Sequence, residues 1–264
     1  GNTFTNTSSL QGKLKEVTQM GAELIGDGSV EADGEMIALV VESLLSAGLT
    51  DFQVSIGQME YFKGICAQAG LDEQTENELR ELISGKNIFG AEELLEGKGV
   101  ADVYCQVLLK VTDYFGTVEV LKEAEKFALN SRSRLAIDRL FKLYQVLCMY
   151  GVEKYVSFDL GMLSKYHYYT GVIFKVYTYG VGEPIVKGGR YDHLLGYFGK
   201  ESPAIGFAVV IDDLMLALGR QKAGIKGADE IIYLTYNPDN YESRLSEAKG
   251  LRKNGRKVSL VPEK

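Results

Sequence analysis

Residues 15–25 read KEVTQMGAELI, and the second half of this stretch alternates between apolar and other side chains. The apolar positions are Met20, Ala22 and Leu24. The positions that alternate with them are Gln19, Gly21 and Glu23. A period of two predicts a β-strand that turns one face toward the core and leaves the other face polar.

The polar face of this predicted strand is suited to a small ligand. Gln19 and Glu23 lie about 13 Å apart along the backbone at ~3.3 Å per residue, and Gly21 leaves the space between them bare. A carboxamide and a carboxylate can both accept N–H groups, so the gap fits an amino acid. The alternative is an ordinary antiparallel face whose polar side chains point at water.

The segments that follow predict an α+β chain with a helical middle at about 58–150. Helical spacing from Ile37 to Leu45 predicts a helix that ends near Gly48, and residues 51–56 predict a second strand. Further helices are predicted over residues 59–68, 73–83, 100–111, 118–129 and 133–149. From residue 153 onward β-rich segments return, and IDDLMLALGR predicts a closing helix.

The end of the chain predicts a second domain. A glycine-bearing linker, AGIKGAD, separates a domain over residues 1–222 from a tail over 223–264. The tail reads strand, helix, strand, which predicts the start of an α/β domain that is cut off early. The first strand of the chain also needs partners that this sequence lacks. We therefore expect both ends to continue in a longer protein.

Composition excludes several classes of protein. Of 264 residues, 45% are hydrophobic and 25% charged, which is a globular mix. The net charge of −7 does not favour nucleic acid as a partner. No apolar run approaches the ~20 residues of a membrane helix, and the first ten residues lack the features of a signal peptide. Three scattered cysteines fit a reducing cytoplasm, and two isolated histidines predict no metal site.

Two further motifs hold candidate binding residues. KYHYYTG (165–171) is the densest aromatic patch, and in a strand its neighbours Tyr168 and Tyr169 would face opposite ways. GGRYD (188–192) predicts a tight glycine turn that leads into Arg190 and a short helix. Arg190 could clamp a carboxylate or a phosphate. Ordinary sheet tyrosines and a common Gly-Gly turn are the alternative explanations.

Three segments, taken in order, resemble the catalytic domain of class II histidyl-tRNA synthetases. They are KLKEVTQMGAELIG (13–26), LSKYHYYTGVIF (163–174), and GGRYDHLLGYFG with SPAIGFAVVIDDL (188–214). The resemblance covers residues 1–60 and 153–215, and the tail is similar to the start of the anticodon-binding domain. It implies an antiparallel sheet flanked by helices, with a helical insertion, in an N-terminally incomplete fragment.

Three positions depart from the synthetase pattern. The family's arginine after a phenylalanine in motif two is Thr5 here, and its histidine-specific arginine is Ser164. The motif-three helix opens with Asp212-Asp213, so Asp213 replaces the arginine that binds ATP phosphate in the family. Adenylation depends on such cations, and their joint loss implies that the reaction is absent. On the residues alone, the paired aspartates also fit a helix N-terminus.

The histidine-binding elements of the family are retained. The resemblance assigns Glu23 to an imidazole N–H and Gln19 to the α-amino group. It implies that Tyr168 or Tyr169 closes over the imidazole ring of the ligand. It also implies that Arg190 shapes its loop and contacts the carboxylate of the ligand.

The stretches NTSSLQGKLKEVTQMGAELIG and YHYYTGVIF resemble ATP phosphoribosyltransferase regulatory subunits more closely than synthetases. This implies a cytoplasmic, non-catalytic subunit for the first step of histidine biosynthesis, without a cofactor. The implied partners are a short-form catalytic subunit, in a hetero-octamer that contains a homodimer of this subunit, and L-histidine as feedback effector. The alternatives are a diverged histidyl-tRNA synthetase and a structural or dimerisation module.

Overall fold

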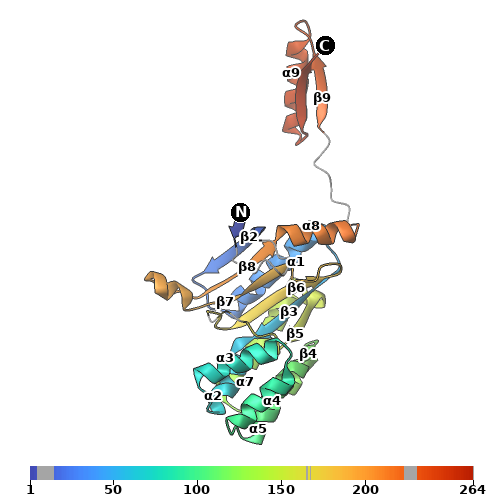
Figure 1. Cartoon of the computed structure of the whole chain (residues 1–264). Helices are drawn as coiled ribbons and strands as arrows, with labels where there is room; N and C mark the ends of the chain where they lie inside the picture. Colours follow the sequence, from blue (N-terminus) through green and yellow to red (C-terminus); the bar gives the residue numbers. More distant parts are fainter. Residues whose placement is uncertain (5–14, 165, 167, 223–230, 264) are drawn as a thin grey trace. The chain divides into compact units, whose positions relative to one another are not determined.

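A large sheet organises the first of the two compact units, residues 1–223 and 224–264, into which the chain separates (Figure 1). The computed structural model describes residues 1–4, 15–164, 166, 168–222 and 231–263. The strands of the sheet are β1 (Asn2–Phe4), β2 (Glu16–Ile25), β3 (Phe52–Gln58), β4 (Phe115–Gly116), β5 (Val156–Asp159), β6 (Val172–Thr178), β7 (Val186–Arg190) and β8 (Ala204–Val210).

The strands lie in the order β1-β2-β8-β7-β6-β3-β5-β4. β3 and β5 pair in parallel, and every other neighbouring pair in the described sheet is antiparallel. The predicted antiparallel sheet is thus confirmed, with one parallel pair in addition. This order places the two strands of the candidate site, β2 and β7, on either side of β8.

The helical middle contains the predicted helices and one more. The helices of this unit are α1 (Val30–Ser46), α2 (Met59–Gln68), α3 (Glu73–Ser84), α4 (Ile88–Gly97), α5 (Asp102–Lys110), α6 (Glu119–Glu125), α7 (Ser131–Tyr150) and α8 (Ile211–Arg220), with short 3₁₀ turns η2 (Val111–Asp113), η3 (Glu153–Tyr155) and η4 (Leu194–Phe198). The pattern missed α4, which is short and begins where the Asn87 side chain accepts from Gly90 N at 3.0 Å. No helix in the described part of the chain is long and apolar enough to cross a membrane.

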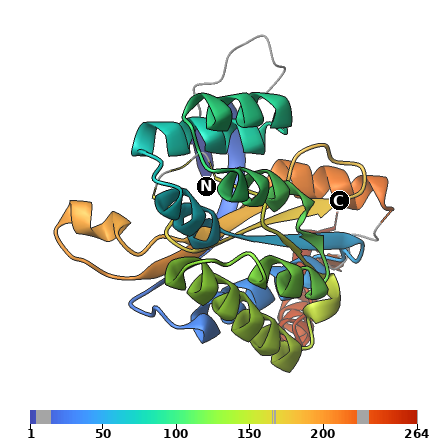
Figure 2. The ribbon, with the colours of Figure 1, turned by 90° about the horizontal axis from the view of Figure 1, so that it is seen from below.

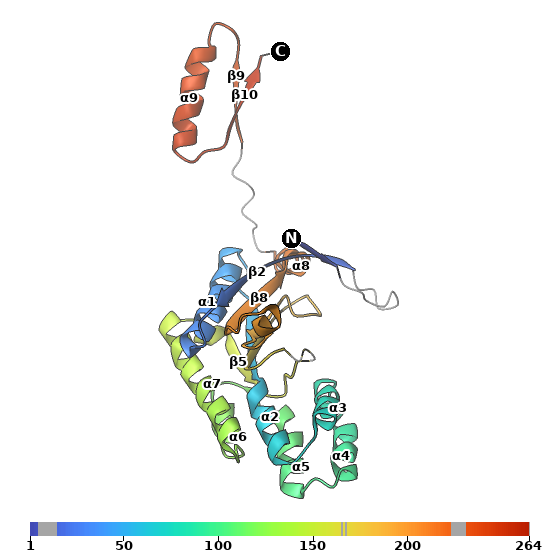
Figure 3. The ribbon, with the colours of Figure 1, turned by 90° about the vertical axis from the view of Figure 1, so that its left-hand side faces the viewer.

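The two faces of the sheet differ. α1 and α7 pack together and cover one face (Figure 3). On the apolar side of β2, Ala22 and Leu24 pack against the hydrophobic core, as the alternation predicts. Met20 is 49% exposed and lies outside the core. The helices α2 to α5 gather near the β3 and β5 end of the sheet (Figures 1 and 2). The opposite, polar face of β2 is therefore not covered by α1 and α7.

Two local predictions were wrong. The two glycines of GGRYD belong to strand β7, not to a turn, and neither has a positive φ. They serve close packing instead, because a Cβ on Gly188 would lie 2.6 Å from the Gly206 carbonyl oxygen. Tyr168 and Tyr169 lie in a loop before β6, where alternation does not apply, and their ring centroids are 4.4 Å apart.

The second unit is the predicted strand–helix–strand tail. β9 (Ile232–Tyr236) and β10 (Val258–Pro262) pair in parallel, and α9 (Tyr241–Lys253) connects them and packs on both. Parallel neighbours need such a crossover connection, because a tight turn can join only antiparallel strands. The βαβ order of the tail is therefore confirmed.

Candidate functional site

The polar face of β2 continues across the sheet as a floor of small residues. Glu23 pairs with Gly206 on β8, and Gly206 pairs with Gly189 on β7. Directly paired residues point to the same face of a sheet, so the two glycines extend the row that begins at Glu23. The adjacent row on the same face consists of Gly21, Ala208 and Lys187.

The glycines of this floor leave room for the side chains above it. A Cβ on Gly206 would overlap Oε2 of Glu23, and a Cβ on Gly189 would lie 2.6 Å from Cε1 of Tyr169. A larger residue at either position would displace the carboxylate or the ring. The Glu23 carboxylate and the Tyr169 ring can therefore lie low on the sheet only because both positions are glycine.

Three tyrosines form an aromatic wall around Glu23. The rings of Tyr168 and Tyr169 are 4.4 Å apart, and Tyr191 meets Tyr168 edge-on at 5.9 Å. The Tyr191 hydroxyl donates a hydrogen bond to Oε2 of Glu23. Burial, and next the Glu23 carboxylate, raise the pKa of Tyr191. This hydroxyl therefore stays protonated and holds the carboxylate in place.

These residues line a cavity of about 220 Å³. A neighbouring cavity of about 360 Å³ shares Tyr169 and Lys187 with it and extends toward Ser164. The first cavity offers a carboxylate acceptor beside aromatic rings. Such a set favours a small ligand that has a flat ring and an N–H group or a positive charge.

The structure brings three of the predicted site residues together. Glu23, Tyr168 and Tyr169 all line the first cavity. Gln19 lies on the same face of β2, paired with Val210, but it does not line this cavity. Its carboxamide has no hydrogen bond to another described residue and remains available on the open side of the site.

Arg190 points away from the cavity. Its Nε donates to Oδ1 of Asp33 at 2.6 Å, and its Nη1 donates to Asp192 and to the Asp27 carbonyl, each at 3.0 Å. Its Nη2 donates to the Ser29 carbonyl at 3.3 Å. The guanidinium is thus held among protein groups and does not line the cavity, so we propose no contact between it and a ligand carboxylate. The contacts support the other predicted role, which is to shape the loop.

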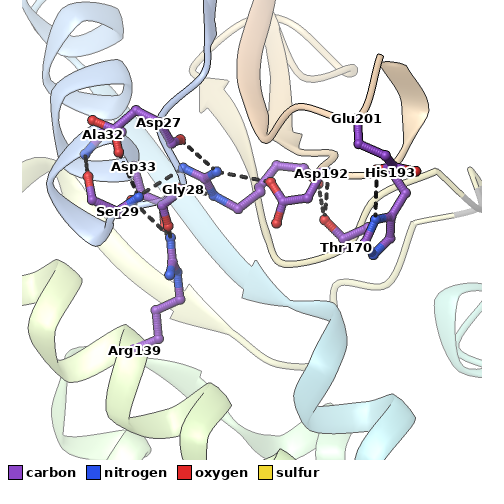
Figure 4. A network of polar contacts seen from close by, with 11 residues as sticks. Asp27, Gly28, Ser29, Ala32, Asp33, Arg139, Thr170, Asp192, His193 and Glu201 are labelled. Atoms are coloured by element: carbon purple, nitrogen blue, oxygen red, sulfur yellow. Dashed lines mark hydrogen bonds and ion pairs between the residues drawn. The ribbon is translucent and has the colours of Figure 1, made fainter. Parts of the chain in front are cut away.

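A buried ion-pair network surrounds Asp33 at the start of α1 (Figure 4). Arg139 on α7 donates from Nε to Oδ2 of Asp33 at 2.8 Å, on the side opposite to Arg190. Ser29 caps the same helix by accepting from Ala32 N at 3.2 Å. Burial raises the pKa of Asp33, and the two arginines oppose this shift. The network joins α1, α7 and β7 beneath the site.

Two of the three departures from the synthetase pattern fall within the described residues, and Thr5 lies outside them. Ser164 is buried, and its hydroxyl accepts from Tyr166 N at 3.0 Å within its own loop. Asp213 lies in the first turn of α8. Burial and the neighbouring Asp212 raise its pKa, and Lys187 opposes the shift. Ser164 lines the neighbouring cavity, and neither position supplies a cation.

Sequence reasoning missed Tyr191 and Gly206 as site residues. A usable signal for Tyr191 was its position directly after Arg190, because neighbours in an extended chain face opposite sides. Arg190 faces α1, and Tyr191 faces the cavity. For Gly206 no signal was available, because its pairing with Glu23 depends on the register of two strands far apart in the sequence.

Comparison with known proteins places these features in context. A family model described as histidyl-tRNA synthetase matches residues 1–214. An ATP phosphoribosyltransferase regulatory subunit from Acetivibrio thermocellus is 40% identical over 98% of this chain, and one from Ruminiclostridium cellulolyticum is 38% identical, also over 98%. In both cases the chain spans 62% of the length of the relative.

Solved structures agree with the predicted class II synthetase-like fold. A Bacillus halodurans protein described as an ATP phosphoribosyltransferase regulatory subunit/histidyl-tRNA synthetase is similar at a TM-score of 0.80 and 33% identity, over 99% of this chain and 66% of that one. A histidyl-tRNA synthetase from Nostoc is similar at 0.75 and 21%, over 96% and 63%. An ATP phosphoribosyl transferase complex from Thermotoga maritima is similar at 0.59 and 18%, over 76% and 68%. The α+β class II prediction is confirmed.

Proposed function

We propose, from the premise that this chain belongs to the histidyl-tRNA synthetase family, that it acts as a regulatory member and not as a ligase. Its proposed role is the non-catalytic regulatory subunit of ATP phosphoribosyltransferase, in the first step of histidine biosynthesis. The observation that carries the proposal is a cavity that retains Glu23 and its aromatic wall, while Ser164 in the neighbouring cavity and Asp213 in the first turn of α8 are not cations. The names of the two relatives at 40% and 38% identity support the same role.

Free histidine is the proposed ligand of the Glu23 cavity. The imidazole N–H donates to the Glu23 oxygen that Tyr191 leaves free, and a ring of the Tyr168–Tyr169 pair lies against the imidazole. Gln19, further along the same strand face, receives the α-amino group. A cavity that binds histidine without activating it acts as a sensor of the end product.

The proposed partner is a short-form catalytic subunit, which needs this subunit for activity. The proposed assembly is a hetero-octamer that contains a homodimer of this subunit, in the cytoplasm. The similarity in fold to the Thermotoga maritima complex supports the choice of partner. Histidine then inhibits by binding one state of the complex better than another, and a typical coupling of ~1–3 kcal/mol changes affinity about 5- to 150-fold.

The test is to mix the purified protein with a short-form catalytic subunit and follow the formation of phosphoribosyl-ATP from ATP and phosphoribosyl pyrophosphate. We expect activity on mixing and inhibition by added histidine. Glu23→Gln should retain activation and lose inhibition, while Glu35→Gln, at an exposed position of α1, should retain both. Absence of activation by the wild-type protein would contradict the regulatory role. Unchanged inhibition of Glu23→Gln would contradict the assignment of the histidine site.

A further inference from the structure

A second and larger cavity lies on the same polar face of the sheet, beyond the tyrosines. Its volume is about 810 Å³, and it lies against β3, β5 and β6 and the C-terminal end of α3. The cavity that extends toward Ser164 separates it from the Glu23 cavity and shares only Ser84, Leu163 and Lys175 with it. Glu23 itself is not part of its lining. Its volume is in the range of sites for small molecules.

Four side chains form a row that leads across the sheet into this cavity. Lys187 on β7 pairs with Lys175 on β6, Lys175 pairs with Ser55 on β3, and Ser55 pairs with Ser157 on β5. Directly paired residues share a face and lie ~4.5–5.5 Å apart between Cβ atoms. Two ammonium groups and two hydroxyl groups are therefore in line on one face. All four can donate hydrogen bonds.

The two serine hydroxyls of the row have no hydrogen-bond partner in the part of the chain that the structure describes. Ser55 is 3% and Ser157 is 8% exposed, and neither Oγ has a hydrogen bond to the described residues. Both serines line the cavity. Buried polar groups in proteins are bonded in the great majority of cases, so this pair at the cavity wall is available to bond a molecule that enters the cavity.

The two lysines of the row have no close partner in the described part of the chain. Neither ammonium forms an ion pair or hydrogen bond with a described residue, and like charges placed directly opposite each other in a sheet repel. Burial, and next Lys187, lower the pKa of Lys175, and the charges of Asp159 and Glu183 oppose this shift. Lys86 and Lys175 are the two cations of the described lining, and Asp159 is the one carboxylate among these residues, whereas Lys187 lies just beyond the cavity. An anion between the ammonium groups would relieve the repulsion.

The lining of the cavity also contains large apolar side chains from α3, α4 and β4. These are Ile83, Ile88 and Phe115, and Ile88 and Phe115 are 36% and 60% exposed. Large apolar side chains that remain open beside a polar floor are typical of small-molecule sites, in which the apolar wall provides contact area and a few polar groups fix the orientation.

We propose that this cavity binds a small phosphate ester that has an apolar ring. The phosphate oxygens accept from the ammonium of Lys175 and from the hydroxyls of Ser55 and Ser157, and the ring lies against Ile83 and Phe115. A phosphate is preferred to a carboxylate, because it brings up to two negative charges and three acceptor oxygens to this excess of donors. The site is separate from the proposed histidine site and does not depend on it.

The experiment is a calorimetric titration of the purified protein with phenyl phosphate, with benzoate and inorganic phosphate as comparison ligands. We expect saturable binding of phenyl phosphate that is tighter than binding of either comparison ligand. Lys175→Met keeps the alkyl stem, removes the charge repulsion, and should weaken binding about 10-fold or more. The double variant Ser55→Ala and Ser157→Ala should weaken it about 5-fold or more. Lys122→Met on the exposed side of α6 and Glu23→Gln should each change it less than about twofold.

Circular dichroism of each variant verifies that it is folded. If phenyl phosphate does not bind saturably, the proposal is overturned. The phosphate assignment fails if benzoate binds as tightly, and the location fails if a folded Lys175→Met variant binds as the wild type does. A loss of phenyl phosphate binding in Glu23→Gln would place the ligand in the histidine cavity and overturn the second site.

Discussion

Asp33 on α1 and Arg190 on β7 form a buried ion pair, with 2.6 Å between Oδ1 and Nε. The side chain of Asp33 is fully buried, and that of Arg190 is 2% exposed. Arg139 approaches the other oxygen of the same carboxylate. Two guanidinium groups thus share the buried Asp33 carboxylate, and Arg190 donates to the half-buried Asp192 as well.

Asp33→Asn is expected to destabilise the protein by about 3–5 kcal/mol, because it leaves two arginines without their buried counter-charge. The free energy of unfolding in urea measures this loss. Glu119→Gln is the matched control, because its ion pair with Lys122 is exposed at both ends. It should cost less than about 1 kcal/mol. Equal losses in the two variants would contradict the structural role of the network.

Glu23→Gln should weaken histidine binding about 10- to 100-fold, because a hydrogen bond to a charged acceptor is replaced by one to a neutral group. Tyr191→Phe should have a smaller effect in the same direction, because it removes the hydrogen bond that fixes the Glu23 carboxylate. Calorimetric titration with histidine measures both. Glu35→Gln provides the control. A folded Glu23→Gln variant with wild-type affinity would remove Glu23 from the site.

Gly206→Ala tests the floor of the cavity without changing any charge. The added methyl overlaps Oε2 of Glu23, so the carboxylate must move from its place beside Tyr191. We expect a loss of about 10-fold or more in histidine affinity, equivalent to ~1.4 kcal/mol or more. Gly219→Ala on α8 is the control, since a Cβ there meets no atom within 4 Å. Unchanged histidine binding in Gly206→Ala would mean that the carboxylate position is not needed.

The alternation of β2 was sufficient to predict half of the site. Period two placed Gln19 and Glu23 on one face, and the structure keeps both there. Neighbours in an extended chain face opposite sides, so the contact of Arg190 with Asp33 on α1 agrees with the position of Tyr191 in the cavity. The sequence predicts a turn at the two glycines before Arg190, whereas in the structure they lie in a strand and allow close packing.

The rest of the site depends on contacts that a single sequence does not display. Tyr168 and Tyr169 come together because their segment is a loop, and loops have no periodicity from which a side chain's direction can be derived. The row from Lys187 to Ser157 requires the register of four strands that are distant in the sequence. Register is set by the packing of the whole sheet, so local patterns could not reveal it.

Tyr114→Phe is expected to flatten the loss of stability at high pH. Burial raises the pKa of Tyr114 to about 12, above the value near 10 of an unfolded chain. Above pH ~10 the unfolded chain releases this proton first, so folding stability falls by up to ~1.4 kcal/mol per pH unit until about pH 12. Near pH 7 the variant should be about as stable as the wild type, because the hydroxyl is buried and has no hydrogen-bond partner among the described residues. Urea unfolding at pH 7, 10 and 11 measures both effects, and an unchanged slope above pH 10 would contradict them.

The proposed loss of synthetase chemistry gives the last prediction. Asp213 and Ser164 stand where the family resemblance expects arginines, and loss of one electrostatic donor alone costs about 10²–10³ in rate. We expect histidine-dependent exchange of pyrophosphate into ATP to be no faster with the wild-type protein than with Glu23→Gln. A thermal shift on addition of histidine shows that the wild-type sample is able to bind it. Exchange that is faster in the wild type than in Glu23→Gln would favour the diverged synthetase. In that case the next residue to replace is Lys187, whose positive charge lowers the pKa of Asp213.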